Sequence, residues 1–247
     1  MQTTIKCRIC GYDNQFYSLK CNKCNNYLRE KVPNIDFWST LWGLIIEPSE
    51  TFQKIIFAEH KNFSLLFNIL FCLKIFVLSI IFSNFFIKPT NHFEFSFIEY
   101  NLLFLLFLTI LFVNIIILSI YSVNRYILKR ANLQLRFRDH FAISYFANFP
   151  IIVGMVILLP IEVSTLGSTM FYWYPNPYFY KPIITIVFIA LEVFFYFYNL
   201  IHNYIGYKIL FKNRKIVIIN IVVLQILYTI YILFGNSIII TIYKNFR

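Results

Sequence analysis

The chain has 247 residues, of which 59% are hydrophobic and only 13% are charged. Soluble domains average about 25% charged residues, so this composition excludes an ordinary soluble protein and indicates an integral membrane protein. The formal net charge of +11 is expected of basic loops beside anionic lipid headgroups, and it gives only weak support to nucleic acid binding.

The first element along the chain is a pair of cysteine knuckles. Ten residues separate two Cys-x-x-Cys motifs, which are formed by Cys7, Cys10, Cys21 and Cys24. This spacing is typical of a tetrahedral zinc site in which each thiolate supplies one ligand. Because a segment of about 30 residues cannot build a stable core, a structural Zn²⁺ would supply most of its stability. We therefore expect residues 1–32 to form a small zinc ribbon.

The role of this predicted ribbon is open at the level of sequence. A four-cysteine shell leaves no position for substrate, which favours a structural ion over a catalytic one, while iron and redox sensing are lesser alternatives. The ribbon's aromatic residues could contact a protein or fill its small core; they are Tyr12, Phe16, Tyr17 and Tyr27. Cys72 lies in a later apolar segment, where a buried thiol usually only packs.

Residues 33–62 predict two short amphipathic helices. The first has an apolar face bordered by Trp38 and Trp42. Pro48 then ends that helix and suits the first position of a second one. Neither helix is long enough to span a bilayer, so we expect both to lie in the headgroup plane, with the two tryptophans as interfacial anchors.

Five later segments are as apolar and as long as a membrane span, which needs about 17–25 residues. They lie near Ser64–Ile87, Asn101–Val123, Phe141–Ile161, Ile183–Ile201 and Ile216–Ile242. The predicted fold class is thus an all-α membrane protein, in which residues 63–247 form a domain of five transmembrane helices. Within the third span we expect Pro150 to kink the helix, and we expect Glu162 to lie at the outer interface.

The basic residues alternate between the two sides of these spans. Most of the 22 Lys and Arg residues precede the first span or fall in the second and fourth gaps, and such residues stay on the cytoplasmic side. This bias predicts a cytosolic N-terminus and a C-terminus outside. The second gap carries the residues that we expect to contact acidic lipid headgroups, namely Arg125, Lys129, Arg130, Arg136 and Arg138.

Two charged residues fall inside predicted spans, Lys74 in the first and Glu192 in the fourth. Counted from the cytosolic ends, each lies roughly ten residues or about 15 Å deep, which predicts an ion pair between them. Such a pair could fix which helices are neighbours, or it could form a proton or ion site in a transporter. A third alternative is that Lys74 extends towards the interface and the two never meet.

Two segments of the chain resemble the Yip1 family. They are Trp42–Phe57, with its Pro-Ser-Glu-Thr-Phe core, and Lys129–Pro150, with a short basic loop and a Tyr-x-x-x-x-Pro motif. The resemblance implies a cytosolic N-terminus and five transmembrane helices. The chain departs from the family pattern at Asn132, where a glycine is common.

The resemblance also bears on function. Eukaryotic members of the Yip1 family work in vesicle traffic and bind small GTPases, whereas bacterial relatives, some with an N-terminal zinc ribbon, have no assigned activity. The ribbon and a composition rich in Phe, Tyr, Ile, Asn and Lys, which an AT-rich genome produces, point to a bacterial relative in the cytoplasmic membrane.

These features together predict a non-enzymatic membrane adaptor or scaffold that binds a protein partner through its zinc ribbon. No phosphate-binding loop, nucleophile elbow or His-Glu-x-x-His motif indicates a catalytic residue. The alternative is a small transporter or channel subunit that uses Lys74 and Glu192. Nucleic acid is a poorer candidate partner, because lipid is the nearer anion, and the sequence is compatible with an oligomer of any size.

Overall fold

The computed structural model describes residues 4–15, 18, 20–28, 34–86, 102–130, 136–167, 180–211 and 213–235. Of the residues singled out above, Phe16, Tyr17 and Asn132 lie outside this part of the chain. The end of the fifth predicted span, beyond Gly235, lies outside it as well.

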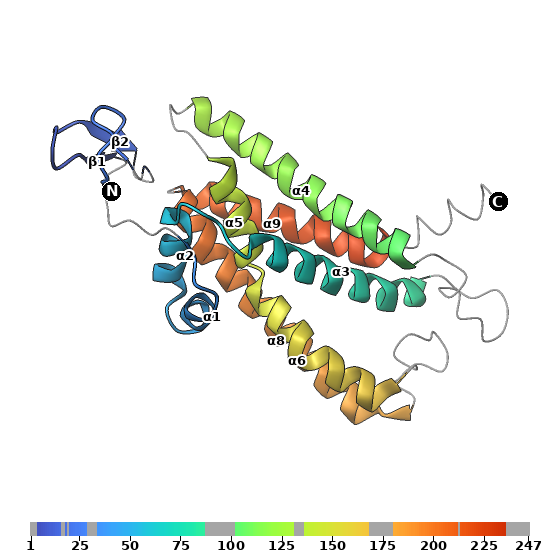
Figure 1. The fold of residues 1–247 in the computed structure, drawn as a ribbon. Coiled ribbons are helices and arrows are strands. Elements are labelled where there is room, and N and C mark those ends of the chain that lie inside the picture. Colours follow the sequence, from blue (N-terminus) through green and yellow to red (C-terminus); the bar gives the residue numbers. More distant parts are fainter. Residues whose placement is uncertain are drawn as a thin grey trace.

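The N-terminal segment is a two-stranded antiparallel sheet flanked by the cysteine knuckles. Strand β1 (Thr4–Lys6) pairs with β2 (Asp13–Gln15). In Figure 1 this small unit lies at one end of the helical bundle, close to the ends of α4 and α5. The Tyr27 hydroxyl donates a hydrogen bond of 2.7 Å to Glu59 Oε1, which connects the unit to the segment before the first span.

Two ten-residue helices follow, α1 (Phe37–Ile46) and α2 (Pro48–Phe57). The Asp36 carboxylate caps α1 by accepting a hydrogen bond of 2.8 Å from the Ser39 N–H, which satisfies one of the free donors of the first turn. Pro48 begins α2, as predicted, because its missing N–H and fixed φ suit a first helical position. The two helices therefore start where the sequence places them.

Five helical stretches are long and apolar enough to cross a membrane, and this confirms the predicted fold class. They are α3 (Ser64–Phe86), α4 (Leu102–Arg130), α5 (Phe137–Phe146) with α6 (Phe149–Leu166), α8 (Pro182–Leu210), and α9 (Arg214–Ile230) with the π-turn η2 (Tyr231–Gly235). Successive stretches run in opposite directions, and α6 and α8 diverge together from α3, α4 and α9 (Figure 1).

The third stretch is broken rather than merely kinked. Helix α5 ends at Phe146, a turn occupies Ala147 and Asn148, and α6 begins one residue before Pro150. Pro150 has no N–H to donate to the Phe146 carbonyl, so it cannot continue α5, but it suits the first turn of α6. The Asn148 side-chain amide donates a hydrogen bond of 2.8 Å to the Ser144 carbonyl, which satisfies one of the acceptors left at the break.

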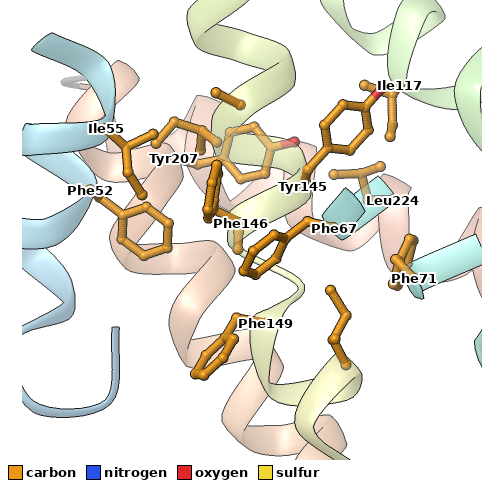
Figure 2. Close-up of a cluster of buried hydrophobic side chains, with 14 of the residues drawn as sticks. Phe52, Ile55, Phe67, Phe71, Ile117, Tyr145, Phe146, Phe149, Tyr207 and Leu224 are labelled. Carbon is orange, nitrogen blue, oxygen red and sulfur yellow. The ribbon is translucent and has the colours of Figure 1, made fainter. Parts of the chain in front are cut away.

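The main hydrophobic core lies at the ribbon end of the bundle, where α2, α3, α5 and α8 meet. Figure 2 shows Phe52 of α2 and Tyr207 of α8 beside Phe146 of α5. The Phe67 ring of α3 lies 4.4 Å from that of Phe146, measured between ring centroids. The apolar face of α2 is buried against protein here, and its location in the headgroup plane stays a prediction. Its position is set by the bundle.

Helix α1 differs from α2 in this respect. Its inner side buries Thr40 and Leu44, whereas Trp38 and Trp42 are 76% and 65% exposed. Ile45 is also exposed. A short helix that exposes two tryptophans and an isoleucine beside a membrane-spanning bundle has the side chains of an interfacial anchor.

Candidate functional site

The four N-terminal cysteines converge on one point. Their sulfur atoms all lie within 4.8 Å of one another, and the closest contacts are Cys7 to Cys24 at 3.6 Å and Cys10 to Cys21 at 3.4 Å between Sγ atoms. A zinc ion with tetrahedral bonds of 2.3 Å holds its sulfurs about 3.8 Å apart, so these separations fit a bound metal. All five cysteines of the chain are free thiols, so no disulfide competes for this group.

The backbone around each knuckle follows the same pattern. In the first, the Gly11 N–H donates to the Cys7 carbonyl, and in the second the Asn25 N–H donates to the Cys21 carbonyl, both at 2.9 Å. Gly11 and Asn25 each directly follow a Cys-x-x-Cys pair, and both have positive φ, 67° and 57°. Asparagine tolerates this conformation better than most residues. Asn25 is thus the structural counterpart of Gly11 in the second knuckle.

Hydrogen bonds from backbone N–H groups favour the ionised form of two of these thiols. The backbone N–H groups of Cys10 and Ile9 lower the pKa of the Cys7 thiol. Burial opposes ionisation of Cys21, but the N–H groups of Cys24 and Lys23 outweigh it and lower the pKa of the Cys21 thiol to about 6. Because thiolates are the form that binds metal, two of the four ligands are favoured in the state that a metal needs.

The surroundings of the cluster contain apolar surface. Ile9, which is 69% exposed, lies between the first two cysteines, and Tyr12 next to that knuckle is also exposed. Tyr12 therefore does not fill a core. Tyr27 is half-exposed and bonds to Glu59, so of the two predicted contact residues that the structure describes, Tyr12 is the more freely exposed.

The structure brings Lys74 and Glu192 together. The Lys74 ammonium forms an ion pair with Glu192 Oε1 between α3 and α8. The lysine is only 1% exposed, so its charge does not reach the interface. The sequence predicted that the fourth span ends at Ile201, and the depth of Glu192 was counted from there. Helix α8 instead continues to Leu210, and its last turns pack beside α2.

Glu162 lies in α6, four residues before the helix ends, and is only 4% exposed because its surroundings are other helices. Its location at the outer interface stays a prediction, since burial against protein does not give depth in a membrane. It interacts electrostatically with both Glu192 and Lys74.

A second cluster of charges, absent from the sequence analysis, joins the segment before α3 to the start of α5. Lys61 Nζ lies 3.2 Å from Asp139 Oδ1, and Arg136 Nε donates to Asp139 Oδ2 at 2.6 Å. The Lys61 ammonium also donates to the Ile56 and Ala58 carbonyls at 2.7 and 2.9 Å, which caps the end of α2. Burial lowers the pKa of Lys61 to about 8, although Asp139 acts in the opposite direction.

A comparison with protein-family models gives one match, to the Yip1 domain, over residues 42–235. The chain belongs to the Yip1 family. No significant match to this Yip1-family chain is found among curated proteins or solved structures. The matched range begins at Trp42, so the cysteine cluster precedes the family domain.

The two segments that resemble the Yip1 family meet in space. Arg136, from the second segment, donates a hydrogen bond of 3.3 Å to the Ile56 carbonyl in the first. Lys61, just after the first, is the residue paired with Asp139 of the second. The Yip1 motifs of this chain therefore form one joint, which holds α2 against α5 and α8.

The basic residues of the second gap all lie at the ribbon end of the bundle. Arg125, Lys129 and Arg138 are exposed, whereas Arg136 is engaged in the joint. The side chain of Arg130 lies outside the described part of this Yip1-family chain. We therefore propose contact with lipid headgroups for Arg125, Lys129 and Arg138.

Proposed function

We propose that this Yip1-family protein is a non-enzymatic membrane adaptor whose zinc ribbon presents a binding surface to a protein partner. The observation that carries the proposal is the closed geometry of the cysteine cluster, with four sulfurs mutually within 4.8 Å. A structural zinc in such a shell has no open position for water or substrate. The role of the ion would be to hold Ile9 and Tyr12 in an exposed position.

The proposed orientation has the ribbon in the cytosol of a bacterial cell, with the C-terminus on the other side of the cytoplasmic membrane. The exposed cations Arg125, Lys129 and Arg138 would face anionic headgroups on that side. Trp38 and Trp42 would anchor α1 in the same interface. The ribbon would then lie within reach of both lipid and cytosolic proteins, and we propose no nucleic acid partner.

The test is co-purification in mild detergent from the native host. Three chains are compared: the full chain, a chain lacking residues 1–35, and the double variant Ile9→Ser/Tyr12→Ser. We expect a partner to be retained by the full chain and lost from the other two. The double variant is the more specific test of the surface. Both side chains are exposed, so the variant should still bind one zinc per chain.

The matched control is Lys74→Met with Glu192→Gln, which removes both charges of the membrane pair and leaves the ribbon intact. An adaptor should keep its partner in this variant. If all the chains purify with the same companions, or alone, the ribbon is not the recruiting surface and the proposal fails.

A transporter or channel subunit is the second candidate function, and the buried pair of Lys74 and Glu192 favours it. Charges inside a membrane are costly and commonly belong to ion or proton pathways. The two candidates differ in what inactivates them. A transporter should tolerate loss of residues 1–35 and fail when Lys74 and Glu192 are neutralised together, whereas an adaptor should show the reverse.

A further inference from the structure

Three ionisable side chains from three helices gather inside the membrane-spanning bundle. Lys74 of α3 pairs with Glu192 of α8, and Glu162 of α6 interacts electrostatically with both. Helix α6 packs against α3 and also against α8, so Glu162 belongs to the same contact region as the pair.

The charges of this group do not balance. Fully ionised, it would carry one positive and two negative charges in surroundings that solvate ions poorly. The Lys74 ammonium is already paired with Glu192, whereas Glu162 is 96% buried and has no hydrogen bond or ion pair from its carboxyl to any described residue. An uncompensated carboxylate there is costly, and taking up a proton removes the cost.

Among the described residues of the helices packed against α6, no other cation is placed to compensate Glu162. Helices α3 and α6 carry no further charged residue. On α8, the other groups that can be positively charged are His202 and Lys208, about 15 and 24 Å further along the axis towards the ribbon end. Lys181, just before α8, donates instead to the Thr165 carbonyl at the end of α6.

Polar atoms without partners lie on both sides of this group along α8. Thr185 and Asn199 are each seven residues from Glu192, so all three share one face of the helix. The Thr185 hydroxyl and both amide atoms of Asn199 are buried and have no hydrogen bond within the described part of the chain. Buried polar atoms of this kind are usually satisfied by ordered water, which would give a proton access to the group.

We propose that Glu162 is a proton-binding site within the membrane, and that its proton controls the pairing of Lys74. With Glu162 neutral, Lys74 pairs with Glu192 and holds α3 beside α8. When Glu162 releases its proton to the flanking water, its carboxylate competes for the same ammonium, which then connects α3 to α6 as well. This inference goes beyond the adaptor function and does not depend on it.

Infrared spectroscopy of the full chain in nanodiscs tests the proposal, since a protonated carboxyl in apolar surroundings has its own carbonyl band. Lipids with ether linkages remove the ester band that would overlap it. Charge balance predicts one such carboxyl at neutral pH in the natural chain, none in Glu162→Gln, and two in Lys74→Met. In Glu192→Gln the band should also vanish, because Glu162 then ionises and becomes the partner of Lys74.

Glu50→Gln is the matched control, because Glu50 lies exposed on α2 and should leave the single band unchanged. Glutamine mimics the protonated acid, so Glu162→Gln should fold. If it does not fold, the second protonated carboxyl expected in Lys74→Met tests the proposal instead. A natural chain without the band, or a band that survives Glu162→Gln, would overturn the site. A band that survives Glu192→Gln would overturn its coupling to Lys74.

Discussion

Single side chains decide how closely the two short helices before the first span approach each other. Gly43 of α1 faces Thr51 of α2, and a Cβ added at Gly43 would lie 2.3 Å from the Thr51 Oγ1 atom. That oxygen is held in place, because the Thr51 hydroxyl donates a hydrogen bond of 3.0 Å to the Glu47 carbonyl. Only a residue without a Cβ fits this contact.

Gly43→Ala should therefore destabilise the protein, by about 1–3 kcal/mol, which is the usual cost of an added methyl group in a packed site. The measurement is thermal unfolding in detergent. Thr51→Ala removes the clashing atom, so the double variant should regain much of the stability that Gly43→Ala loses. If Gly43→Ala lowers the stability equally in the natural chain and in the Thr51→Ala variant, the contact is not as close as described.

At the scale of elements, the ribbon and the helices owe their stability to different causes. The ribbon has two strands of three residues each, which bury too little apolar surface to fold alone. The spans satisfy their own backbone hydrogen bonds and are stable in lipid for that reason. The sequence predicted both kinds of element, because cysteine spacing and apolar length are local properties of the chain.

Removing the metal should unfold the ribbon and leave the helices intact. A strong chelator should abolish protection from amide hydrogen exchange in residues 4–28, with helical circular dichroism nearly unchanged. Cys24→Ser should lose the bound zinc, whereas Cys72→Ser should retain it, because Cys72 lies in α3 bonded to Asn68. A ribbon that stays protected without metal would contradict this prediction.

Acid should release the metal. The pKa of Cys21 is lowered from 9.0 to about 6, so its thiolate persists above that pH and takes up a proton below it. Stability linked to this thiolate is complete above about pH 9, declines as the pH falls below that value, and is lost as the pH falls through about 6. Zinc release measured against pH should therefore have its midpoint at or below that value.

Helix ends were predicted less well than helices. Helix α4 continues past Val123 to Arg130, and α8 past Ile201 to Leu210. Both extensions carry polar and basic residues, which hydropathy excludes from a span but which are compatible with a helix outside the apolar layer. In α8 the extension is stabilised by tertiary contacts: the His202 ring lies 2.8 Å from the Leu44 carbonyl.

For the whole molecule, five alternating crossings bring the ribbon, the joint of α2 with α5, and the exposed basic residues to one end (Figure 1). The most apolar part of α8 contributes little to the interior, whereas its turns at the ribbon end bury His202, Asn203 and Tyr207. The proposed side of the membrane for the ribbon rests on the distribution of basic residues alone.

Labelling with a membrane-impermeant maleimide should establish that side. In a background with all five cysteines replaced by serine, Arg138→Cys places a thiol at the ribbon end and Ser164→Cys places one at the opposite end of α6; both positions are exposed. With the ribbon in the cytosol, intact cells should label only at position 164, and permeabilised cells at both. Labelling at position 138 in intact cells would reverse the proposed orientation.

Sequence alone determined the four-cysteine cluster, the five spans, the family resemblance and the charge asymmetry, because each depends on spacing or composition within one segment. It also predicted that Lys74 and Glu192 pair, since a span tolerates a charge best beside its opposite. Only the tertiary structure decided that Glu162 joins them and that Lys61 meets Asp139. These contacts depend on how each helix is rotated and how far it is shifted along its neighbours. In a span such as α3, apolar residues lie on every side of the helix, so the sequence does not specify its rotation or its shift.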